Sequence, residues 1–454
     1  MGEPSPEETI APCDGETRGG GHAARERIAD RRRELGRHAL VGVDAQHPVV
    51  ARLRDGKILL RAVAFEGVLD HACPGALRYR YGIIAAARID HDRFRRERRG
   101  REALRQLVGS VAGDHDERQP KRFGHAGEVY AMKRLLVVRP SSLGDIVHTL
   151  SLVSDVVAHA PDTPIDWVAE EAFAPLVVLD KRIRRVIPVA LRRWRSAPLA
   201  ASTRREFLAF RRDLRSDRYD VILDLQEQVK GALLARMAKG TRHGFDKSNI
   251  REPLATWLDD VHHVIDRDQH FIDKARALAA GALGYEVSSA PRWQLSPPSS
   301  PAGAPRGPYA LAFHATSRED KLWPEARWRA LIAHYAQAGL QVLLPWGHDD
   351  ERARSERLAL DASNTIVPER RSLPELASLA RGAEIVVGVD TGLTHLAAAL
   401  GTPTVAIFTA TDATLAGVAR SGPHAIDIGG NGHVPALSEA IAASGRVLRN
   451  APRC

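Results

Sequence analysis

The pattern of apolar residues changes abruptly at Met132, and this change constrains the fold of the 454-residue chain more than any other feature. From Lys133 onward, short continuous apolar runs alternate with stretches of helical periodicity. Arg134–Val138 (RLLVV) is typical of a buried strand, and a loop and a helical pattern over Ile146–His159 follow it. Alternation of this kind predicts an α/β fold in which helices cover parallel sheets.

The alternation runs in two blocks separated by a Pro-, Ser- and Gly-rich stretch at residues 291–308, which predicts an interdomain linker. The first block adds a predicted helix at Ser202–Leu214 and predicted strands at Ile165–Val168, Val186–Ala190 and Tyr219–Leu225. In the second block the predicted strands are Tyr309–His314, Leu340–Pro345, Glu384–Val389 and Thr404–Phe408. Its predicted helices are Glu325–Ala338, Asp350–Leu360, Leu373–Arg381, Leu393–Leu400 and Ala436–Leu448.

Two Rossmann-like domains follow from this pattern, an N-terminal one over residues 132–295 and a C-terminal one over residues 305–454. In such folds ligands bind beyond the carboxyl ends of the strands. We therefore expect a site in a cleft between the two domains, and closure of that cleft when ligands bind.

Residues 1–131 differ from the rest because they are Arg-rich and show little strand–helix alternation. Two basic clusters lie at Asp30–Glu34 and Phe94–Glu102, and Lys57–Val63 fits a short strand. One interpretation is a separate regulatory or nucleic-acid-binding domain. The favoured interpretation is an extension that is disordered or that precedes a true translation start at Met132.

The number of cysteines and the distribution of apolar residues limit the classes of protein to which the chain can belong. The three cysteines are Cys13, Cys73 and Cys454, which excludes a disulfide framework or a Cys-ligated metal site in the main body and fits a reducing cytoplasm. The amino terminus lacks the layout of a secretory signal, and no apolar run approaches the roughly 18 to 20 residues that a membrane span needs. The expected location is therefore cytoplasmic.

The formal charge of +9 is shared between both parts of the chain and fits a nucleic acid, an anionic membrane or a phosphorylated substrate. Basic and aromatic residues do not interleave as nucleic-acid stacking platforms require, which weakens the first option. The chain also lacks a G-x-x-x-x-G-K-[ST] or G-x-G-x-x-G phosphate loop, and this weakens kinase and dehydrogenase interpretations.

Three loops between a predicted strand and a predicted helix carry candidate chemistry. In Arg139–Asp145 (RPSSLGD), Asp145 falls at a helix start, where it is either a helix cap or a catalytic carboxylate. His314–Pro324 (HATSREDKLWP) offers two hydroxyls and Lys321 to phosphate oxygens, or is a polar loop before a helix. Gly388–His395 (GVDTGLTH) predicts an anion site at a helix amino terminus, with His395 one turn inside.

A fourth segment is basic. Leu191–Arg195 (LRRWR) clusters three guanidinium groups, and Arg251–Pro253 lies downstream. Such clusters suit bidentate recognition of carboxylate or phosphate, although a solvated charge run has the same composition.

Taken in order, these segments resemble the lipopolysaccharide heptosyltransferases of glycosyltransferase family 9, which have the two-domain GT-B architecture. The similarity covers the chain from Met132 and includes RPSSLGDIVHTL, DVILDLQEQVKGALLA, FHATSREDKLWPEARW and VGVDTGLTHLAAALG. The RRWR and HATSREDK-x-WP motifs resemble type I of this family more than type II. Residues 1–131 share nothing with it.

The resemblance implies inverting transfer of L-glycero-D-manno-heptose from ADP-heptose to Kdo of lipid A-Kdo, without a metal or other cofactor. It implies that Asp145 is the general base and that Lys321 assists departure of ADP. It also implies donor contacts by Thr316, Ser317, Lys321, Asp349, Asp390, Thr391, Gly392 and His395. The implied acceptor contacts are Arg192, Arg193, Arg195 and Arg251.

The implied partners are therefore ADP-L-glycero-β-D-manno-heptose, a Kdo-lipid A acceptor and the cytoplasmic face of the inner membrane, with no nucleic acid. Three alternatives stay open. The chain is a heptosyltransferase acting on a later core acceptor, a sugar-nucleotide epimerase of similar architecture, or a basic nucleic-acid-binding protein.

Overall fold

The computed structural model describes residues 40–41, 49–54, 57–61, 89–90, 134–299, 304–360 and 362–450. By its internal contacts the chain forms two units, Met1–Glu117 and Arg118–Cys454. The described residues of the first unit form an antiparallel sheet of strands β1 (Leu40–Val41), β2 (Val49–Arg54), β3 (Lys57–Arg61) and β4 (Ile89–Asp90). The strand predicted at Lys57–Val63 is thus confirmed as β3, whereas the two Arg-rich clusters lie outside the described residues.

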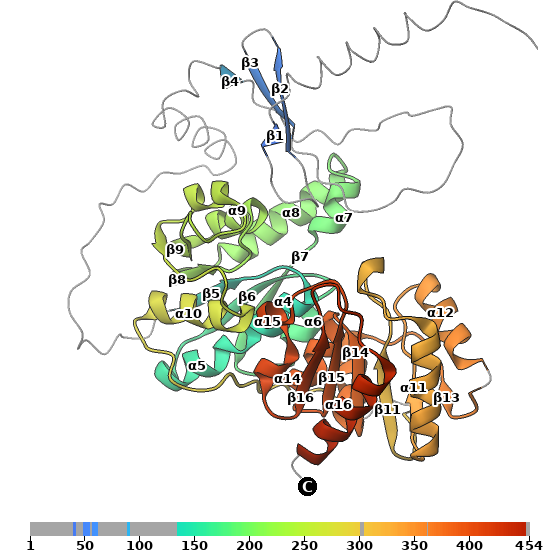
Figure 1. Cartoon of the computed structure of the whole chain (residues 1–454). Helices are drawn as coiled ribbons and strands as arrows, with labels where there is room; N and C mark the ends of the chain where they lie inside the picture. The colour runs from blue at the N-terminus through green and yellow to red at the C-terminus, as the bar shows by residue number, and fades with distance from the viewer. Residues whose placement is uncertain are drawn as a thin grey trace, which may run out of the picture. The chain divides into compact units, whose positions relative to one another are not determined.

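The second unit contains two six-stranded parallel sheets, which confirms the α/β fold class. In the first sheet the order is β10-β9-β8-β5-β6-β7. Its strands are β5 (Leu135–Val138), β6 (Ile165–Glu170), β7 (Ile183–Val189), β8 (Arg218–Asp224), β9 (Lys239–Phe245) and β10 (Val261–His263). From β5 the chain runs outward to β7 and then returns to the other side of β5 for β8, so the direction of winding reverses between β5 and β8 (Figure 1).

Strands β9 and β10 were missed from the sequence because their residues do not form an apolar run. Strand β9 reads KGTRHGF, and β10 has only three residues, VHH. Their place is set by parallel pairing with a neighbouring strand, since β9 pairs with β8 and β10 with β9. Tertiary contacts have therefore overridden local composition.

Helices cover both faces of this sheet. Helices α7 (Leu191–Ser196), α8 (Ala201–Leu214) and α9 (Val229–Met237) share one apolar core with strand residues such as Leu136, Val138 and Ile222. Helix α10 (Phe271–Leu283) contacts α4 (Leu143–Leu150), α5 (Leu152–His159), β8 and β9. The remaining short elements are α6 (Ala174–Val177) and the 3₁₀ helix η1 (Pro253–Leu258).

The single helix predicted at Ile146–His159 was wrong in its extent. The structure has two helices, α4 and α5, separated at Ser151. The Ser151 hydroxyl donates to the His148 carbonyl oxygen at 2.7 Å and thereby takes an acceptor from the helix ladder. Helix α4 also begins three residues earlier than expected, at Leu143.

The second sheet repeats the winding, with strand order β13-β12-β11-β14-β15-β16. Its strands are β11 (Tyr309–Phe313), β12 (Gln341–Leu343), β13 (Thr365–Ile366), β14 (Ile385–Val389), β15 (Thr404–Phe408) and β16 (Ala425–Gly429). The four strands predicted from the sequence are confirmed, although β12 is shorter at both ends. Strands β13 and β16 were not predicted.

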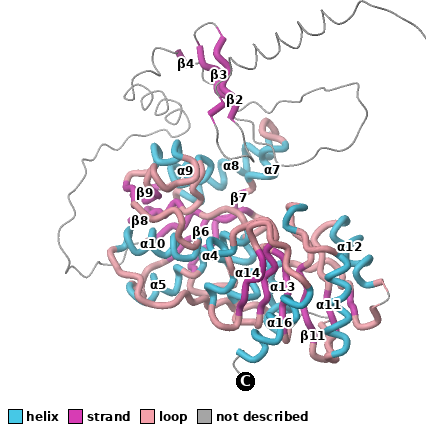
Figure 2. Tube along the Cα trace, viewed as in Figure 1, coloured by secondary structure: helices cyan, strands magenta, loops and turns pink. Residues whose placement is uncertain are grey.

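Alternate residues of β11 show how this sheet is covered. Ala310 and Ala312 lie in a core with α11 (Glu325–Gln337), α12 (Asp349–Ala359) and α16 (Leu437–Asn450). Tyr309, Leu311 and Phe313 lie in a second core with α13 (Leu373–Gly382) and α14 (Gly392–Ala399). Figure 2 shows these helices (cyan) around the strands (magenta), the arrangement expected for a parallel sheet buried on both faces.

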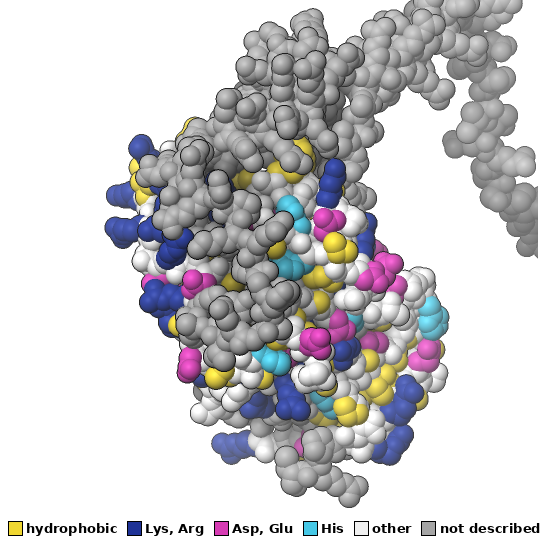
Figure 3. All heavy atoms as spheres, turned by 90° about the vertical axis from the view of Figure 1, so that its left-hand side faces the viewer, with side chains coloured by type: hydrophobic (Ala, Val, Ile, Leu, Met, Phe, Trp, Pro, Cys, Tyr) yellow, Lys and Arg dark blue, Asp and Glu magenta, His cyan; other side chains and the backbone are white. Residues whose placement is uncertain are grey.

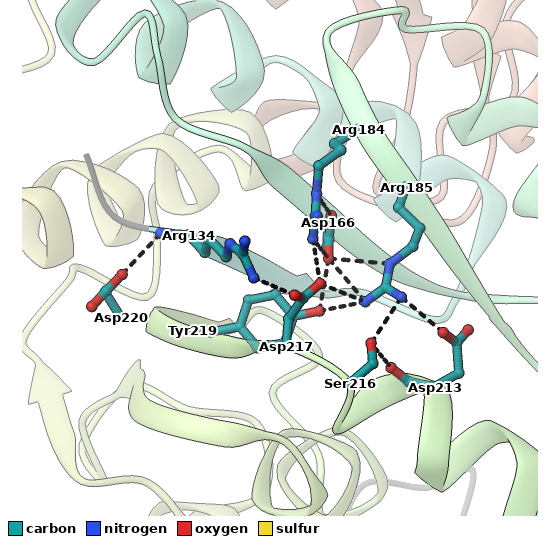
Figure 4. Close-up of polar contacts among 9 residues, drawn as sticks. All are labelled: Arg134, Asp166, Arg184, Arg185, Asp213, Ser216, Asp217, Tyr219 and Asp220. Atoms are coloured by element: carbon teal, nitrogen blue, oxygen red, sulfur yellow. Dashed lines mark hydrogen bonds and ion pairs between the residues drawn. The ribbon is translucent and has the colours of Figure 1, made fainter.

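At the amino edge of the first sheet, a network of ion pairs joins the beginnings of the strands (Figure 4). Asp166, which is fully buried near the start of β6, accepts hydrogen bonds from Arg184 at 2.6 Å and from the Tyr219 hydroxyl at 2.7 Å. Arg185 bonds both Asp166 and Asp213. Buried charges require such partners, so this network stabilises the sheet at that edge.

No helix in the described part of the chain is both long and apolar enough to cross a membrane.

Candidate active site

The candidate site lies where the carboxyl ends of the central strands meet in each sheet. Asp145 follows β5, Thr316 follows β11, and Asp390 follows β14. Strands β5 and β8 flank the reversal of the first sheet, and β11 and β14 flank that of the second. Ligands of doubly wound folds bind at such reversal points, because the connecting loops diverge there.

The two halves meet at this site through the amino ends of α4 and α14, which contact each other. Glycines make the approach possible. A Cβ atom on Gly392 would lie 2.6 Å from Leu143 Cγ and 2.7 Å from the Gly144 amide nitrogen. Gly392 was predicted to form a donor-binding turn, and the structure shows in addition that a larger residue there would push the two helices apart.

Asp145 lies at the third position of α4 and forms a capping box with Ser142, the residue that caps the helix. Its Oδ2 atom accepts hydrogen bonds from the Ser142 amide and the Ser142 hydroxyl, both at 2.8 Å. Its Oδ1 atom pairs with Arg139 Nη2 at 2.8 Å. Asp145 is thus held at a helix amino terminus, although it is not itself the cap.

These contacts control the ionisation of Asp145. Burial of the carboxyl raises its pKa, but the Arg139 guanidinium and the Ser142 amide outweigh burial and bring the pKa to about 2. Asp145 is therefore a carboxylate at every physiological pH. About a quarter of its side chain stays exposed, so one face is open to a ligand.

Asp390 is the centre of a second polar cluster, on the side of the second half. Its Oδ2 atom pairs with Lys321 Nζ at 2.8 Å and accepts a hydrogen bond from the Thr411 hydroxyl at 2.6 Å. Its Oδ1 atom lies 3.4 Å from His395 Nε2. Burial opposes ionisation, but His395 and Lys321 hold the pKa of Asp390 well below its usual range.

A histidine pair connects the two halves. His148 Nε2 of α4 lies 3.3 Å from His395 Nδ1 of α14, and both rings are buried. His270 also lies near His148, with the ring centroids 5.6 Å apart, and its Nε2 atom is 2.9 Å from the Gly417 carbonyl oxygen. Burial, His395 and His270 lower the pKa of His148 well below its usual range, so His148 is neutral.

The other predicted donor residues lie on the same loops but differ in their contacts. The Thr316 hydroxyl donates to the Asp390 carbonyl oxygen at 3.2 Å, and Thr391 is the cap of α14. Ser317 is exposed. Asp349 is also exposed, at the first position of α12, whereas the Glu351 carboxylate nearby accepts the Gly347 amide at 2.7 Å.

The basic cluster on α7 is tied to the loop that carries Asp145. The Glu170 amide donates to the Pro140 carbonyl oxygen at 3.0 Å, and the Glu170 carboxylate accepts the Arg192 amide at 3.1 Å. Burial raises the pKa of this Glu170 carboxyl. The start of α7 is therefore fixed at the carboxyl edge, beside the candidate base.

Within α7 the three arginines have different surroundings. The Arg192 guanidinium lies 5.3 Å from the centroid of the Phe173 ring. Arg193 is already paired with Glu171 at 3.0 Å and with Glu206 at 2.7 Å, whereas Arg195 is exposed. Arg193 must exchange these partners if it is to bind a ligand.

A chain of side-chain amides links Arg251 to the same edge. The Gln226 side chain, just after β8, accepts a hydrogen bond from the Ser141 backbone amide at 3.2 Å. It donates a hydrogen bond to the Gln228 side-chain oxygen, also at 3.2 Å. Gln228 in turn donates to Glu252 at 3.2 Å, next to the exposed Arg251. These hydrogen bonds bring the Arg251 segment to the loop that carries Asp145.

The sequence did not single out Arg139, His148 or Thr411, although each contacts a predicted site residue, nor Gln226, which contacts the loop that carries Asp145. The missed signal for Gln226 was its position two residues after a buried strand, where polar side chains reach the carboxyl edge. Arg139 is the first residue after β5. His148 gains its role through a contact with His395 across the two halves, and Thr411 through a contact with Asp390 within the second half.

The chain is similar in sequence to a family of known proteins. Residues 207–429 match the model of glycosyltransferase family 9 (heptosyltransferase). Lipopolysaccharide heptosyltransferase 1 of Salmonella typhimurium is 42% identical over 287 residues, which are 63% of this chain and 90% of that protein. The corresponding enzyme of Pseudomonas aeruginosa is 39% identical and covers 61% of this chain and 78% of its own length.

A solved structure is similar over the same region. The heptosyltransferase WaaC of Escherichia coli with ADP superimposes with a TM-score of 0.64 at 36% identity. The match covers 69% of this chain and 99% of that one.

Proposed function

Since the chain belongs to glycosyltransferase family 9, the heptosyltransferases, we propose that it transfers L-glycero-D-manno-heptose from ADP-heptose to Kdo of lipid A-Kdo. The observation that carries this proposal is that the loop after β5 and the loops of the second half meet where α4 contacts α14. The loop after β5 offers an ionised carboxylate, Asp145, with cationic residues nearby for the acceptor. The loops of the second half offer Lys321 and the amino end of α14 to a nucleotide diphosphate.

The donor belongs to the second half in this proposal. Lys321 and the amino terminus of α14 supply positive charge without a metal, and the leaving ADP carries its developing negative charge toward them. Lys321 pairs with Asp390 in the structure, so binding of the diphosphate requires this lysine to share or exchange its partner. A structure of WaaC with ADP-2-deoxy-2-fluoro heptose, 37% identical with a TM-score of 0.61, supports a nucleotide-heptose donor.

Asp145 is the proposed general base. The acceptor hydroxyl oxygen forms a bond to C1 of the heptose while the bond from C1 to the ADP oxygen breaks, and the hydroxyl proton passes to Asp145. A carboxylate with a pKa of about 2 is a weak base, so the proton moves late, after the forming bond has made the hydroxyl acidic. This single displacement inverts the anomeric centre.

The acceptor belongs to the first half in this proposal. Kdo is a carboxylic acid and lipid A carries phosphates, and guanidinium groups bind both kinds of anion in a bidentate way. We assign this role to Arg192, Arg193, Arg195 and Arg251, which α7 and the Gln226–Glu252 hydrogen bonds hold near the Asp145 loop. The enzyme then acts at the cytoplasmic face of the inner membrane, where an acylated acceptor is available.

A transfer assay with two acceptors tests the function. The full chain is incubated with ADP-heptose and either Kdo-lipid A or an acceptor that already carries the first heptose, and products are identified by mass spectrometry. We expect one heptose on Kdo-lipid A, in inverted configuration, and no product from the second acceptor. Transfer only to the heptosylated acceptor would assign the chain to a later step, and conversion of ADP-heptose without any acceptor would assign it to the epimerases.

A further inference from the structure

We propose that the exposed face of α8, together with the turn that precedes it, docks on an anionic lipid surface. The turn between α7 and α8 carries Leu199, whose side chain is 96% exposed. Helix α8 carries Leu208, which is 50% exposed. Single exposed leucines are common on protein surfaces. Here the informative feature is the set of charges around them.

Three arginines surround Leu208 on one face of α8. Arg204 and Arg212 lie four residues before and after it, and Arg205 lies three residues before it, so all share its side of the helix. All three are exposed. Among the described residues, Arg204 and Arg212 have no ion pair or hydrogen-bond partner, so their charges are available to an external anion.

The acidic residues of α8 leave Arg204 and Arg212 unpaired within the described part of the chain, because their carboxylates bond other side chains, although Glu206 also interacts electrostatically with Arg205. Glu206 bonds Arg193 at 2.7 Å and the Trp194 indole at 2.8 Å. Asp213 accepts a hydrogen bond from Arg185 at 2.8 Å. The opposite, apolar side of α8 packs Phe210 and Leu214 into the core of the first half. The helix is therefore anchored on one side and basic with an apolar centre on the other.

An exposed leucine among arginines, with a second exposed leucine in the preceding turn, fits one partner chemistry best. Arginine side chains meet lipid phosphates at the headgroup level, while the leucines reach the acyl boundary below it. A nucleic acid would use the arginines but not Leu199, and a protein partner would not require an excess of one charge. Figure 3 shows Lys and Arg side chains (dark blue) on one face of the described surface, mixed with acidic and neutral ones.

The position of this face relates it to the candidate site. Leu199 lies three residues after the end of α7, whose arginines are among the proposed acceptor contacts. This docking surface rests on the proposed function, because an acceptor with acyl chains is held in the membrane. Docking through α8 would place α7 at the depth of the acceptor headgroup, so that the sugar could reach Asp145 without leaving the membrane.

Vesicle sedimentation tests the proposal with the full chain. Vesicles of phosphatidylglycerol and phosphatidylcholine are compared with vesicles of phosphatidylcholine alone, for the wild type and for the double variants Leu199→Asp/Leu208→Asp and Arg204→Gln/Arg212→Gln. Each arginine near an anionic surface contributes about fivefold to partitioning, so we expect the arginine variant to bind about 25-fold less. The leucine variant should lose at least tenfold, because it loses two apolar anchors and gains two repelled charges.

Leu360→Asp is the matched control, since Leu360 is 61% exposed but lies after α12 in the second half. It should bind vesicles like the wild type. Unchanged vesicle binding by both double variants would overturn the proposal. Binding of the wild type to a DNA duplex at physiological salt, without binding to vesicles, would also overturn it.

A second readout separates docking from catalysis. Both double variants should transfer heptose to a water-soluble, deacylated Kdo acceptor at the wild-type rate but should lose transfer to Kdo-lipid A embedded in vesicles. If the wild type binds anionic vesicles through α8 yet transfers heptose to neither acceptor, the proposed function fails and the docking surface stands. If turnover on the soluble acceptor also collapses, α8 serves the active site rather than a lipid surface.

Discussion

The two edges of the first sheet carry buried aspartates in opposite circumstances. At the amino edge, Asp166 is matched by Arg184, Arg185 and the Tyr219 hydroxyl (Figure 4). At the carboxyl edge, Asp224 ends β8 and is buried beside Asp259. Among the described atoms, one carboxyl oxygen of Asp224 and both of Asp259 have no hydrogen-bond partner.

The pKa values show the same contrast. Burial and the neighbouring Asp259 raise the pKa of Asp224 well above its usual range, and burial raises the pKa of Asp259 to about 7. The buried aspartate at the amino edge is thus paired with cationic partners. At the carboxyl edge, Asp224 and Asp259 are buried with carboxyl oxygens that lack hydrogen-bond partners among the described residues, which lowers stability. Perturbed and unsatisfied groups cluster at functional sites, so this difference itself points to the carboxyl edge as the place of chemistry.

The largest expected effect is on catalysis at the carboxyl edge. Asp145→Asn removes the proposed proton acceptor but keeps the shape of the side chain, and we expect turnover to fall about 10²- to 10⁴-fold. ADP-heptose affinity, measured by calorimetry, should change less than threefold because Asp145 lies on the acceptor side. Near-normal turnover would remove Asp145 from the role of base.

The next effect is on stability at the amino edge. Asp166→Ala leaves Arg184, Arg185 and Tyr219 without their shared acceptor, and we expect the free energy of unfolding to fall by about 3 kcal/mol. Urea denaturation measures this change. Arg134→Ala is the control at the same edge, because Arg134 is 45% exposed and its ion pair with Asp217 should contribute less than about 1 kcal/mol.

A smaller effect is expected on donor binding. Lys321→Met removes a charged donor from the diphosphate, and loss of one charge-assisted hydrogen bond should weaken ADP-heptose binding about 10- to 100-fold. Lys181→Met, on the exposed surface of the first half, is the matched control. Unchanged ADP-heptose affinity in Lys321→Met would show that the lysine pairs only with Asp390 and does not contact the diphosphate.

The smallest effect concerns pH. The pKa of Asp259 is higher in the folded than in the unfolded chain, so the native state binds more protons between about pH 4 and 7. This group therefore lowers stability as pH rises through that range. Asp259→Asn should remove this slope and raise the free energy of unfolding at pH 8 by about 1 to 3 kcal/mol. A denaturation series from pH 4 to 8 measures it, and parallel curves for both proteins would contradict the assignment.

Much of the fold could be predicted because buried parallel strands such as β5, β14 and β15 are short apolar runs. Strands β9, β10 and β13 could not, since they are polar or very short and take their place from their neighbours. Strand β16 (AIDIG) was missed because Asp427 interrupts its apolar residues. The candidate loops could be located from the strand–helix alternation. Their partners could not, because the contacts of His148 with His395 and of Thr411 with Asp390 join residues far apart in sequence.

The basic segment shows a further limit of composition. The sequence grouped Arg192, Arg193 and Arg195 as equivalent acceptor contacts. In the structure Arg193 is occupied by Glu171 and Glu206, and Arg192 lies over Phe173. Which arginine is available depends on Glu171, just after β6, and on Glu206 of α8, and spacing along α7 does not reveal it.

The central claim is that the carboxyl edge performs the chemistry while the amino edge only stabilises the sheet. The most direct measurement compares heptose transfer to Kdo-lipid A by Asp145→Asn and Asp166→Ala at saturating substrates, with rates divided by the folded fraction of each variant. We predict that Asp145→Asn retains at most about 1% of wild-type turnover, whereas Asp166→Ala stays within about twofold of it. Comparable losses in the two variants would contradict the division between the edges.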